Sequence, residues 1–222
     1  MHFPFSPTVA CSDLLSPEDF TFHYENLKYA HERRKTYLCY HLERLDGDRR
    51  VMLDSAVIQN QGSRHVEECF LFSENVLEKL KAPGSYSVTW YLSWSPCARC
   101  AQAVIRFLQQ HPNVRLRILV ARLYFHETRA NRAALRALRR REAPIEIMSP
   151  EDFAYCWKHF VDHRGEDFQP WEDMDANVDR LAEELSGIWL VRSPAPLLPS
   201  ALPRPSLPGA LPSLTLPAGS LS

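Results

Sequence analysis

Residues 86–110 read YSVTWYLSWSPCARCAQAVIRFLQQ, an apolar run that passes directly into a helical pattern. The run Tyr86–Ser93 is typical of a β-strand, and the apolar spacing over Pro96–Gln110 predicts an α-helix. Ser95 is expected to be the N-cap residue of that helix, because the proline after it has a fixed φ that suits the first helical position. The segment therefore predicts a strand, a tight turn and a helix in immediate succession.

The two cysteines at the start of this helix match a second motif upstream. Cys97 and Cys100 lie three residues apart, so both thiols can bind one ion from the same helix face. His65 begins a further helical pattern, expected over His65–Leu80, and Glu67 lies in its first turn. One imidazole and two thiolates supply three zinc ligands and leave the fourth tetrahedral position for water, as in catalytic sites. Glu67 is then the expected proton carrier.

A Cys-x-x-Cys motif taken alone has two other interpretations, a redox pair and half of a structural zinc site. A redox pair gives no reason for His65 and Glu67, and a structural site needs a fourth cysteine or histidine nearby. The sequence holds no second Cys-x-x-Cys, and the remaining cysteines are scattered: Cys11, Cys39, Cys69 and Cys156. The last three fall in apolar runs and are expected to be buried thiols. The pattern therefore favours a hydrolytic zinc site.

Strand-like and helix-like segments alternate along the chain. The expected strands are Lys35–Arg44, Val51–Ile58, Tyr86–Ser93, Val114–Leu123 and Ile145–Met148, and the expected helices are Pro17–Tyr29, His65–Leu80, Pro96–Gln110, Thr128–Arg141, Pro150–Phe160 and Trp171–Trp189. This alternation predicts an α/β fold in which about six helices flank both faces of a five-stranded mixed sheet. In such sheets, binding sites form outside the strand ends and near helix N-termini, which is where the motif lies.

Composition limits the class of protein. The 222 residues, 45% of them hydrophobic, suffice for one domain, expected at 15–192 after an N-terminal extension of residues 1–14. Residues 193–222 are rich in Pro, Leu and Ser and are expected to form a disordered tail. No apolar run is long enough to span a membrane, and the first residues lack the pattern of a signal peptide. Six cysteines without framework spacing favour a reducing compartment, so we expect the cytoplasm, with access to the nucleus.

Charge is unevenly distributed, although the formal net charge is only −1. Acidic residues gather between Glu166 and Glu184. Basic residues form clusters at Arg33-Arg34-Lys35, at Arg49-Arg50 and Arg64, at Arg115, Arg117 and Arg122, and along Arg129, Arg132, Arg136, Arg139, Arg140 and Arg141. A near-neutral chain can still bind a polyanion through a local patch. The run from Arg129 to Arg141 is equally well interpreted as the solvated face of a helix.

Several stretches resemble the AID/APOBEC polynucleotide cytidine deaminases. They occur in order between Leu15 and Leu190: Thr36–Tyr40 (TYLCY), Asn60-Gln61, Thr89–Cys97 (TWYLSWSPC), Ala121–Tyr124 (ARLY), Cys156–His163 (CWKHFVDH) and Phe168–Trp171 (FQPW). His-x-Glu followed by Pro-Cys-x-x-Cys is also the signature of the zinc-dependent nucleobase deaminases. The FQPW segment is most similar to the antiviral APOBEC branch, whereas Phe125-His126-Glu127 is nearer to activation-induced deaminase.

The resemblance implies a cytidine deaminase-like three-layer fold and hydrolytic deamination of cytosine to uracil in single-stranded DNA. It implies one Zn²⁺ on His65, Cys97 and Cys100, with Glu67 as proton carrier. It further implies RNA as a second partner and a role in antiviral and retroelement restriction. The residues implied to contact the nucleic acid are Thr36, Asn60, Trp94, Ser95, Tyr124, Arg33 and Arg34. The sequence does not indicate an oligomeric state.

The choice of cytosine is implied to depend on the loop from Tyr124 to Arg129, which reads the base on the 5′ side in relatives. Members with Tyr-Asp favour a 5′ thymine, but here Phe125 and His126 follow the tyrosine. Stacking tolerates any base, whereas hydrogen bonds to a base edge discriminate. We therefore expect a soft preference for 5′ thymine, with purine contexts as the alternative.

Two other functions are compatible with the motif. One is deamination of free cytidine or a deoxycytidine nucleotide, which needs neither arginine-rich loops nor the aromatic pair Tyr124-Phe125. The other is a catalytically weak relative that binds RNA or protein, against which the intact Glu67 argues.

Overall fold

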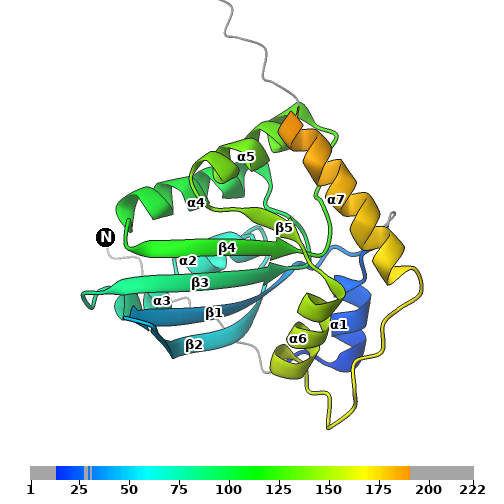
Figure 1. Cartoon of the computed structure of the whole chain (residues 1–222), viewed down its shortest axis with the longest axis horizontal. Helices are drawn as coiled ribbons and strands as arrows, with labels where there is room; N and C mark the ends of the chain where they lie inside the picture. Colours follow the sequence, from blue (N-terminus) through cyan, green and yellow to red (C-terminus); the bar gives the residue numbers. More distant parts are fainter. Residues whose placement is uncertain (1–13, 28–29, 31, 191–222) are drawn as a thin grey trace, which may run out of the picture. The chain divides into compact units, whose positions relative to one another are not determined.

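The computed structural model describes residues 14–27, 30 and 32–190, which contain one five-stranded sheet. In spatial order, its strands are β2 (Arg49–Gln59), β1 (Tyr37–Asp46), β3 (Ser85–Leu92), β4 (Val114–Val120) and β5 (Ile145–Ile147). β1 is antiparallel to both of its neighbours, and β3, β4 and β5 run parallel. The expected mixed sheet is therefore confirmed (Figure 1).

Helices cover both faces of the sheet. They are α1 (Pro17–Tyr24), α2 (Val66–Leu71), α3 (Glu74–Leu80), α4 (Ala98–Gln110), α5 (Arg129–Arg140), α6 (Pro150–Phe160) and α7 (Met174–Leu190). One face packs against α2, α3, α4, α5 and the last turns of α7 through aliphatic side chains around the buried Trp90. The opposite face packs against α1 and α6 through a cluster rich in aromatic residues, including Trp157 (Figure 1). These layers confirm the α/β/α architecture.

Four segments that carry predicted site residues meet at one end of the sheet. Because β1 is antiparallel to its neighbours, its first residues lie beside the last residues of β2 and β3, and Leu92 at the end of β3 pairs with Val120 at the end of β4. The loops that precede β1 and follow β2, β3 and β4 are thereby brought together. The expectation of a site outside the strand ends follows from this topology.

The prediction of one helix over His65–Leu80 is wrong, because two helices occupy that segment. α2 ends at Leu71, and the side chain of Ser73 caps α3 by accepting a hydrogen bond from the backbone N–H of Val76 at 3.4 Å. A serine that bonds local backbone N–H groups starts a helix more readily than it continues one. The split accounts for seven helices where about six were expected.

The predicted N-cap of α4 is also wrong. The helix begins at Ala98 with Cys97 as its N-cap residue, two residues later than expected. Ser95 has other partners, since its Oγ accepts a hydrogen bond from the backbone N–H of Tyr124 at 2.9 Å. The serine therefore joins the loop after β3 to the loop after β4, a contact across the sheet that local sequence does not indicate.

Tertiary contacts also shorten the first and last helices. α1 ends at Tyr24, not at Tyr29, because the buried Asn26 donates from Nδ2 to the carbonyl of Met174 at 3.0 Å. The indole of Trp171 donates to the side-chain oxygen of Asn26 at 2.7 Å, and α7 starts only at Met174. The strand expected to reach Leu123 ends at Val120, and the remaining expected boundaries differ from the observed ones by at most two residues.

Parts of several predictions lie outside the described residues. These are the N-terminal extension (residues 1–14) except Leu14, the proline-rich tail (residues 193–222) and Cys11. The other predicted thiols, Cys39, Cys69 and Cys156, are buried as expected. Among the described helices, none is both long and apolar enough to cross a membrane.

Candidate functional site

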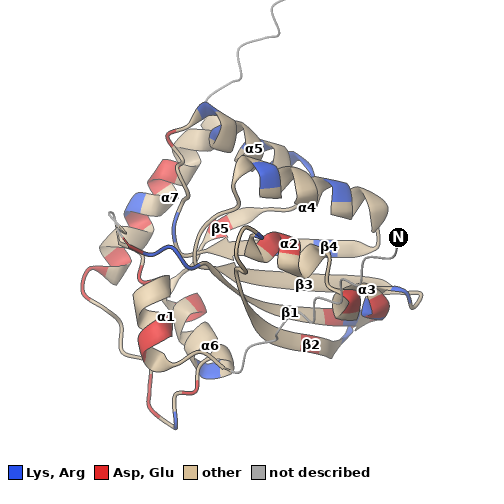
Figure 2. Ribbon diagram, turned by 180° about the vertical axis from the view of Figure 1, so that it is seen from behind, with Lys and Arg blue, Asp and Glu red and all other residues tan. Residues whose placement is uncertain are grey.

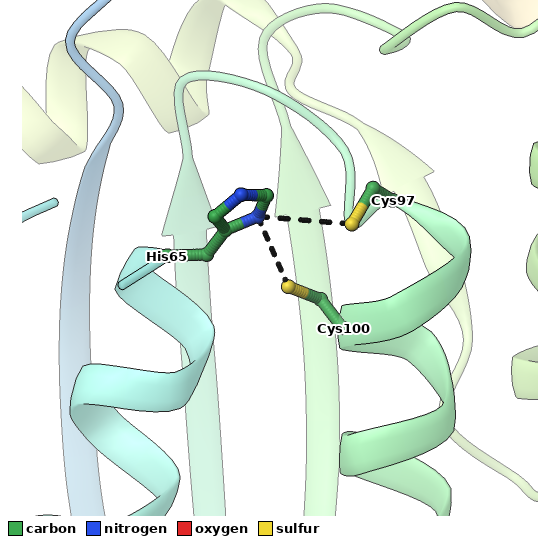
Figure 3. Close-up of side chains that lie close together, drawn as sticks. All are labelled: His65, Cys97 and Cys100. Carbon is green, nitrogen blue, oxygen red and sulfur yellow. Dashed lines mark hydrogen bonds between the residues drawn. The ribbon is translucent and has the colours of Figure 1, made fainter. Parts of the chain in front are cut away.

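The three predicted metal ligands converge at the N-termini of two neighbouring helices (Figure 3). His65 is the N-cap residue of α2, Cys97 is the N-cap residue of α4, and Cys100 lies in the first turn of α4. The Nδ1 atom of His65 lies 3.7 Å from Sγ of Cys97 and 3.3 Å from Sγ of Cys100. All three atoms lie within 4.8 Å of one another.

This donor set fits a zinc ion. Tetrahedral coordination with Zn–S bonds near 2.3 Å and Zn–N bonds near 2.0 Å places the sulfur and nitrogen atoms about 3.6 Å apart. The measured separations of 3.3 and 3.7 Å lie on either side of that value. His65, Cys97 and Cys100 can therefore hold one ion, and three protein ligands leave a coordination position for a reactant.

Glu67 is the second residue of α2 and is only 4% exposed. Burial raises the pKa of Glu67 to about 7, because the charged carboxylate loses its hydration. A hydrogen bond from the Cys100 thiol lowers the pKa of Cys97 to about 5, while the same bond and burial raise the pKa of Cys100. A bound cation would favour the charged form of all three groups.

A salt bridge holds the two helix N-termini together beside the ligands. The guanidinium of Arg99 in α4 lies 2.6 Å from the carboxylate of Glu68 in α2. The same carboxylate accepts a hydrogen bond from the backbone N–H of His65 at 3.3 Å. Glu68 thus fixes the backbone that carries His65 and links it to the helix that carries both cysteines.

A cavity of about 190 Å³ opens beside the metal ligands. The predicted site residues that line it are Arg34, Thr36, Asn60, His65, Glu67, Trp94, Ser95, Cys97 and Tyr124. They come from the four loops at the end of the sheet and from the first turn of α2. The structure therefore brings these residues to one place, and it adds Gly62 and Ser63, which the sequence analysis did not single out.

Thr36 and Asn60 form a pair at one side of this cavity. The backbone N–H of Thr36 donates to Oδ1 of Asn60 at 2.8 Å, and the backbone N–H of Asn60 donates to the carbonyl of Thr36 at 3.1 Å. Because its oxygen is already engaged, Asn60 can offer its amide nitrogen to a ligand.

Trp94 and Tyr124 form an aromatic corner on the opposite side. Their rings meet edge to face with centroids 6.2 Å apart. The guanidinium of Arg122 lies 4.3 Å from the ring centroid of Trp94, in a cation–π contact. Arg122, which belongs to one of the basic clusters in the sequence, is 1% exposed.

Arg122 is anchored to the end of α1. Its guanidinium donates to the carbonyls of His23 and Glu25. Burial lowers the pKa of Arg122 to about 9, which leaves the guanidinium protonated at neutral pH. Arg122 therefore links the Trp94 ring to the end of α1. The sequence pattern gives no signal for this role.

A second cavity of about 510 Å³ adjoins the first and shares Arg34, Thr36, Trp94 and Tyr124 with it. Phe125, 61% exposed, and His126 also line it. The imidazole Nε2 of His126 lies 3.3 Å from the carboxylate of Glu184 in α7. Phe125 and His126, two predicted contact residues, therefore line a cavity that adjoins the one beside the metal ligands.

The two arginines before β1 have different surroundings. The guanidinium of Arg33 lies 2.6 Å from the carboxylate of Glu25 and 4.4 Å from the ring centroid of Phe22. It is therefore engaged within the protein, although Arg33 also lines the second cavity. Arg34 lines both cavities and is the better placed of the two to meet a phosphate.

Part of the arginine run on α5 has a structural role that neither interpretation of the run included. Arg132 and Arg136 donate to the carbonyls of Gly187 and Ile188 near the end of α7. The guanidinium of Arg139 lies 5.1 Å from the ring centroid of Trp189. Figure 2 shows basic residues on α5 and acidic residues along α7, in agreement with the charge pattern of the sequence.

Comparison with known proteins gives consistent matches. Residues 13–189 match the family model "APOBEC3, cytosine deaminase domain". The chain is 41% identical over 167 residues to "DNA dC->dU-editing enzyme APOBEC3" of Rattus norvegicus, which covers 74% of this chain and 39% of the relative. It is 36% identical over 184 residues to "C->U-editing enzyme APOBEC-2" of Homo sapiens, covering 81% of each. The chain thus spans about two-fifths of the rat relative's length.

Proposed function

The chain belongs to the AID/APOBEC family and carries an APOBEC3 cytosine deaminase domain, and on that premise we propose that it deaminates cytosine to uracil in single-stranded DNA. The observation that carries the proposal is the position of Glu67. It is buried, it lies beside a three-ligand metal site, and it lines a cavity that aromatic side chains also line. A rat relative and a mouse relative are both named as DNA dC->dU-editing enzymes, which supports DNA as the substrate.

The reaction adds water to C4 of cytosine and releases ammonia, with no net oxidation. Zinc on His65, Cys97 and Cys100 would make a water molecule nucleophilic at neutral pH. The Glu67 carboxylate would accept a proton from the attacking water and deliver it to ring N3, and would then take the proton of the new C4 hydroxyl and pass it to the departing amine, which leaves as ammonia. Its position fits this work, because Glu67 lines the cavity beside the metal ligands and a general acid–base group must lie within reach of the atoms between which it moves protons.

The walls of the cavity fit one extruded pyrimidine. Trp94 and Tyr124 offer ring faces and edges, and base–aromatic stacking contributes roughly 1–3 kcal/mol per base. Thr36 and Asn60 are assigned to the sugar and base, and the main chain of Ser95 to the exocyclic amine. A base inside a duplex cannot enter such a pocket, so single-stranded DNA is the proposed substrate.

The adjoining cavity favours a polynucleotide over a free nucleoside. It lies beyond Trp94 and Tyr124, is lined by Phe125 and His126, and has room for a neighbouring base. Arg34 lies where the two cavities meet and is assigned to the strand's phosphates. RNA as a second partner, a role in antiviral and retroelement restriction, and a cytoplasmic location with nuclear access complete the proposal.

A single assay tests this function. Purified protein is incubated with a cytosine-containing oligonucleotide in single-stranded DNA, double-stranded DNA and RNA form, and with free cytidine, and uracil or uridine formation is measured. We expect turnover to be fastest on single-stranded DNA. Faster turnover of free cytidine would favour the nucleoside deaminase, and binding of RNA without turnover of any substrate would favour the catalytically weak relative.

A further inference from the structure

Asn131, in the first turn of α5, is buried and bonded to two parts of the site at once. Its Oδ1 atom accepts a hydrogen bond from the backbone N–H of Ala98, the first residue of α4, at 3.0 Å. Its Nδ2 atom donates to the carbonyls of Tyr124 and Phe125, at 3.1 and 3.2 Å. The residue is 8% exposed, and it lines neither cavity described above.

The network fixes the orientation of the Asn131 amide. Only the amide oxygen can accept from an N–H group, and only the NH₂ group can donate to two carbonyls. This position therefore needs a side chain of the length of asparagine that carries both an acceptor oxygen and a donor NH₂ group. It joins the helix that carries Cys97 and Cys100 to the loop that carries Tyr124 and Phe125.

The Phe125 backbone needs this support. Its φ of +37° is strained for a residue with a Cβ atom, and such geometry persists where surrounding contacts determine it. The Phe125 carbonyl accepts from three donors: Nδ2 of Asn131 at 3.2 Å, Oγ1 of Thr128 at 2.9 Å and the backbone N–H of Thr128 at 3.1 Å. These bonds fix the backbone that carries the Phe125 ring, and that ring lies edge to face with Tyr124, with centroids 4.7 Å apart.

We propose that Asn131 is the positioning residue that sets sequence context: without touching DNA, it fixes the Phe125 ring relative to the metal ligands and so determines which base is accepted on the 5′ side of the cytosine. The inference rests on the proposed deamination of single-stranded DNA. A ring held at one distance from the reacting base accepts some neighbours better than others. A ring released from that position meets each neighbour in several orientations and discriminates less.

The variant Asn131→Asp separates the two functions of the side chain. The carboxylate keeps the acceptor for Ala98, at the positive end of α4, but it cannot donate to the two loop carbonyls and repels them. We expect zinc content to remain one per chain. The ratio of kcat/KM between the best and the worst 5′ base should fall to near 1, because a ring that is no longer held in one position stacks on every neighbouring base alike.

Asn113→Asp is the matched control. Asn113 donates from Nδ2 to the carbonyl of Gly84 at 2.8 Å in an exposed turn, so the substitution makes the same chemical change away from the cavities. Four single-stranded oligonucleotides, identical except for T, C, A or G before a single cytosine, provide the ratio. Asn113→Asp should keep the wild-type ratio. An unchanged ratio in Asn131→Asp, or an equal loss in all four contexts with loss of zinc, overturns the proposal.

Hydrogen exchange gives a readout that does not depend on activity. In Asn131→Asp, the Thr128 amide should exchange about tenfold faster or more while the Ala98 amide stays protected. Unchanged exchange at Thr128, alongside an active wild-type protein, overturns the role of Asn131 alone. If wild-type protein deaminates none of the oligonucleotides, the proposed function fails, and the role of Asn131 in choosing cytosines fails with it.

A second pair of variants covers the case in which Asn131→Asp does not fold. Thr128→Val removes the hydroxyl that donates to the Phe125 carbonyl, and Thr128→Ser keeps it. We expect the context ratio to fall in Thr128→Val, by less than in Asn131→Asp, and to stay at the wild-type value in Thr128→Ser. Equal ratios in the two Thr128 variants contradict the proposal.

Discussion

The cavity has two sides that are built in different ways. The ligand side, His65, Glu67, Cys97 and Cys100, belongs to the N-caps and first turns of two helices. The aromatic side, Trp94, Tyr124 and Phe125, belongs to loops that hydrogen bonds and a cation–π contact hold in place, from Ser95, Asn131 and Arg122. The starts of two helices position the proposed metal ligands and proton carrier, whereas individual side chains hold the aromatic residues assigned to the substrate.

This difference predicts that substitutions on the two sides have different effects, one on the reaction itself and the other on the choice of cytosine. A change on the ligand side should stop the reaction in every sequence context, because it removes a metal ligand or the proton carrier. A change on the aromatic side should leave the metal in place and alter which cytosines react. The predictions below test that separation, beginning with the largest expected effect.

Cys97→Ser should abolish both zinc binding and deamination. A serine hydroxyl does not ionise near neutral pH, so only two effective ligands remain. Metal analysis of the purified protein and the uracil assay measure the two losses. Cys69→Ser is the control, since Cys69 is buried in α2 but is not a ligand, and it should keep one zinc ion per chain. Stoichiometric zinc in Cys97→Ser would contradict the ligand assignment.

Glu67→Gln should lower kcat by about 10²–10⁴-fold, the usual contribution of a general acid–base group, while zinc content and melting temperature hold. Glutamine has the same shape but cannot accept the proton. Glu74→Gln makes the same chemical change at an exposed position in α3, outside both cavities, and should keep the wild-type rate. Turnover in Glu67→Gln at the wild-type rate would remove this residue from the mechanism.

Phe125→Asp should sharpen the preference for a 5′ thymine by about tenfold without changing zinc content, because a carboxylate can hydrogen-bond a base edge where a ring can only stack. Sequencing of a random single-stranded library after deamination measures the preference. Phe72→Asp replaces an equally exposed phenylalanine, 59% against 61%, outside both cavities and should leave the preference unchanged. A loss of all activity in Phe125→Asp would contradict the separation of the two sides.

Acidic pH should destabilise the folded protein through His23, whose carbonyl accepts a hydrogen bond from Arg122. Of the predicted changes, this one should alter activity at neutral pH the least. Burial lowers the pKa of His23 to about 4 in the folded protein, against about 6.5 unfolded, so the unfolded chain binds more protons between these values. Stability should therefore fall as pH falls from 6.5 to 4, by about 1–3 kcal/mol from this residue.

Urea unfolding at pH 7 and pH 5 measures that loss, and His23→Gln should show a shallower dependence on pH than wild type. Equal slopes in His23→Gln and wild type would show that His23 does not titrate differently on unfolding.

Local sequence was enough for the ligand side and for the order of elements. The spacing of His65, Cys97 and Cys100 predicted a group whose ligand atoms the structure brings within 4.8 Å of one another, close enough to bind one ion. Periodicity predicted α6 without error at Pro150–Phe160, because Ser149 and the proline after it mark the start of the helix in the sequence itself. Both signals span only a few residues.

The aromatic side could not be predicted to the same degree. Its residues were identified through resemblance, but the groups that support them were missed or misassigned: Ser95 was taken as a helix cap, Arg122 as a member of a basic cluster, and Asn131 was not singled out. Each acts through a partner on another element, as Arg122 does on His23 and Glu25, almost 100 residues earlier. Periodicity carries no information about such partners.

The sequence alone therefore indicated the proposed chemistry of this protein, because candidate metal ligands and a proton carrier are recognised by residue type and short spacing. The tertiary structure decided how the substrate side is held, because a buried arginine or asparagine is defined by the distant carbonyls and rings it meets. Asn131 illustrates the reason: its side chain bonds both the loop before α5 and the first residue of α4, and only the packing of α4 against α5 creates the bond to α4.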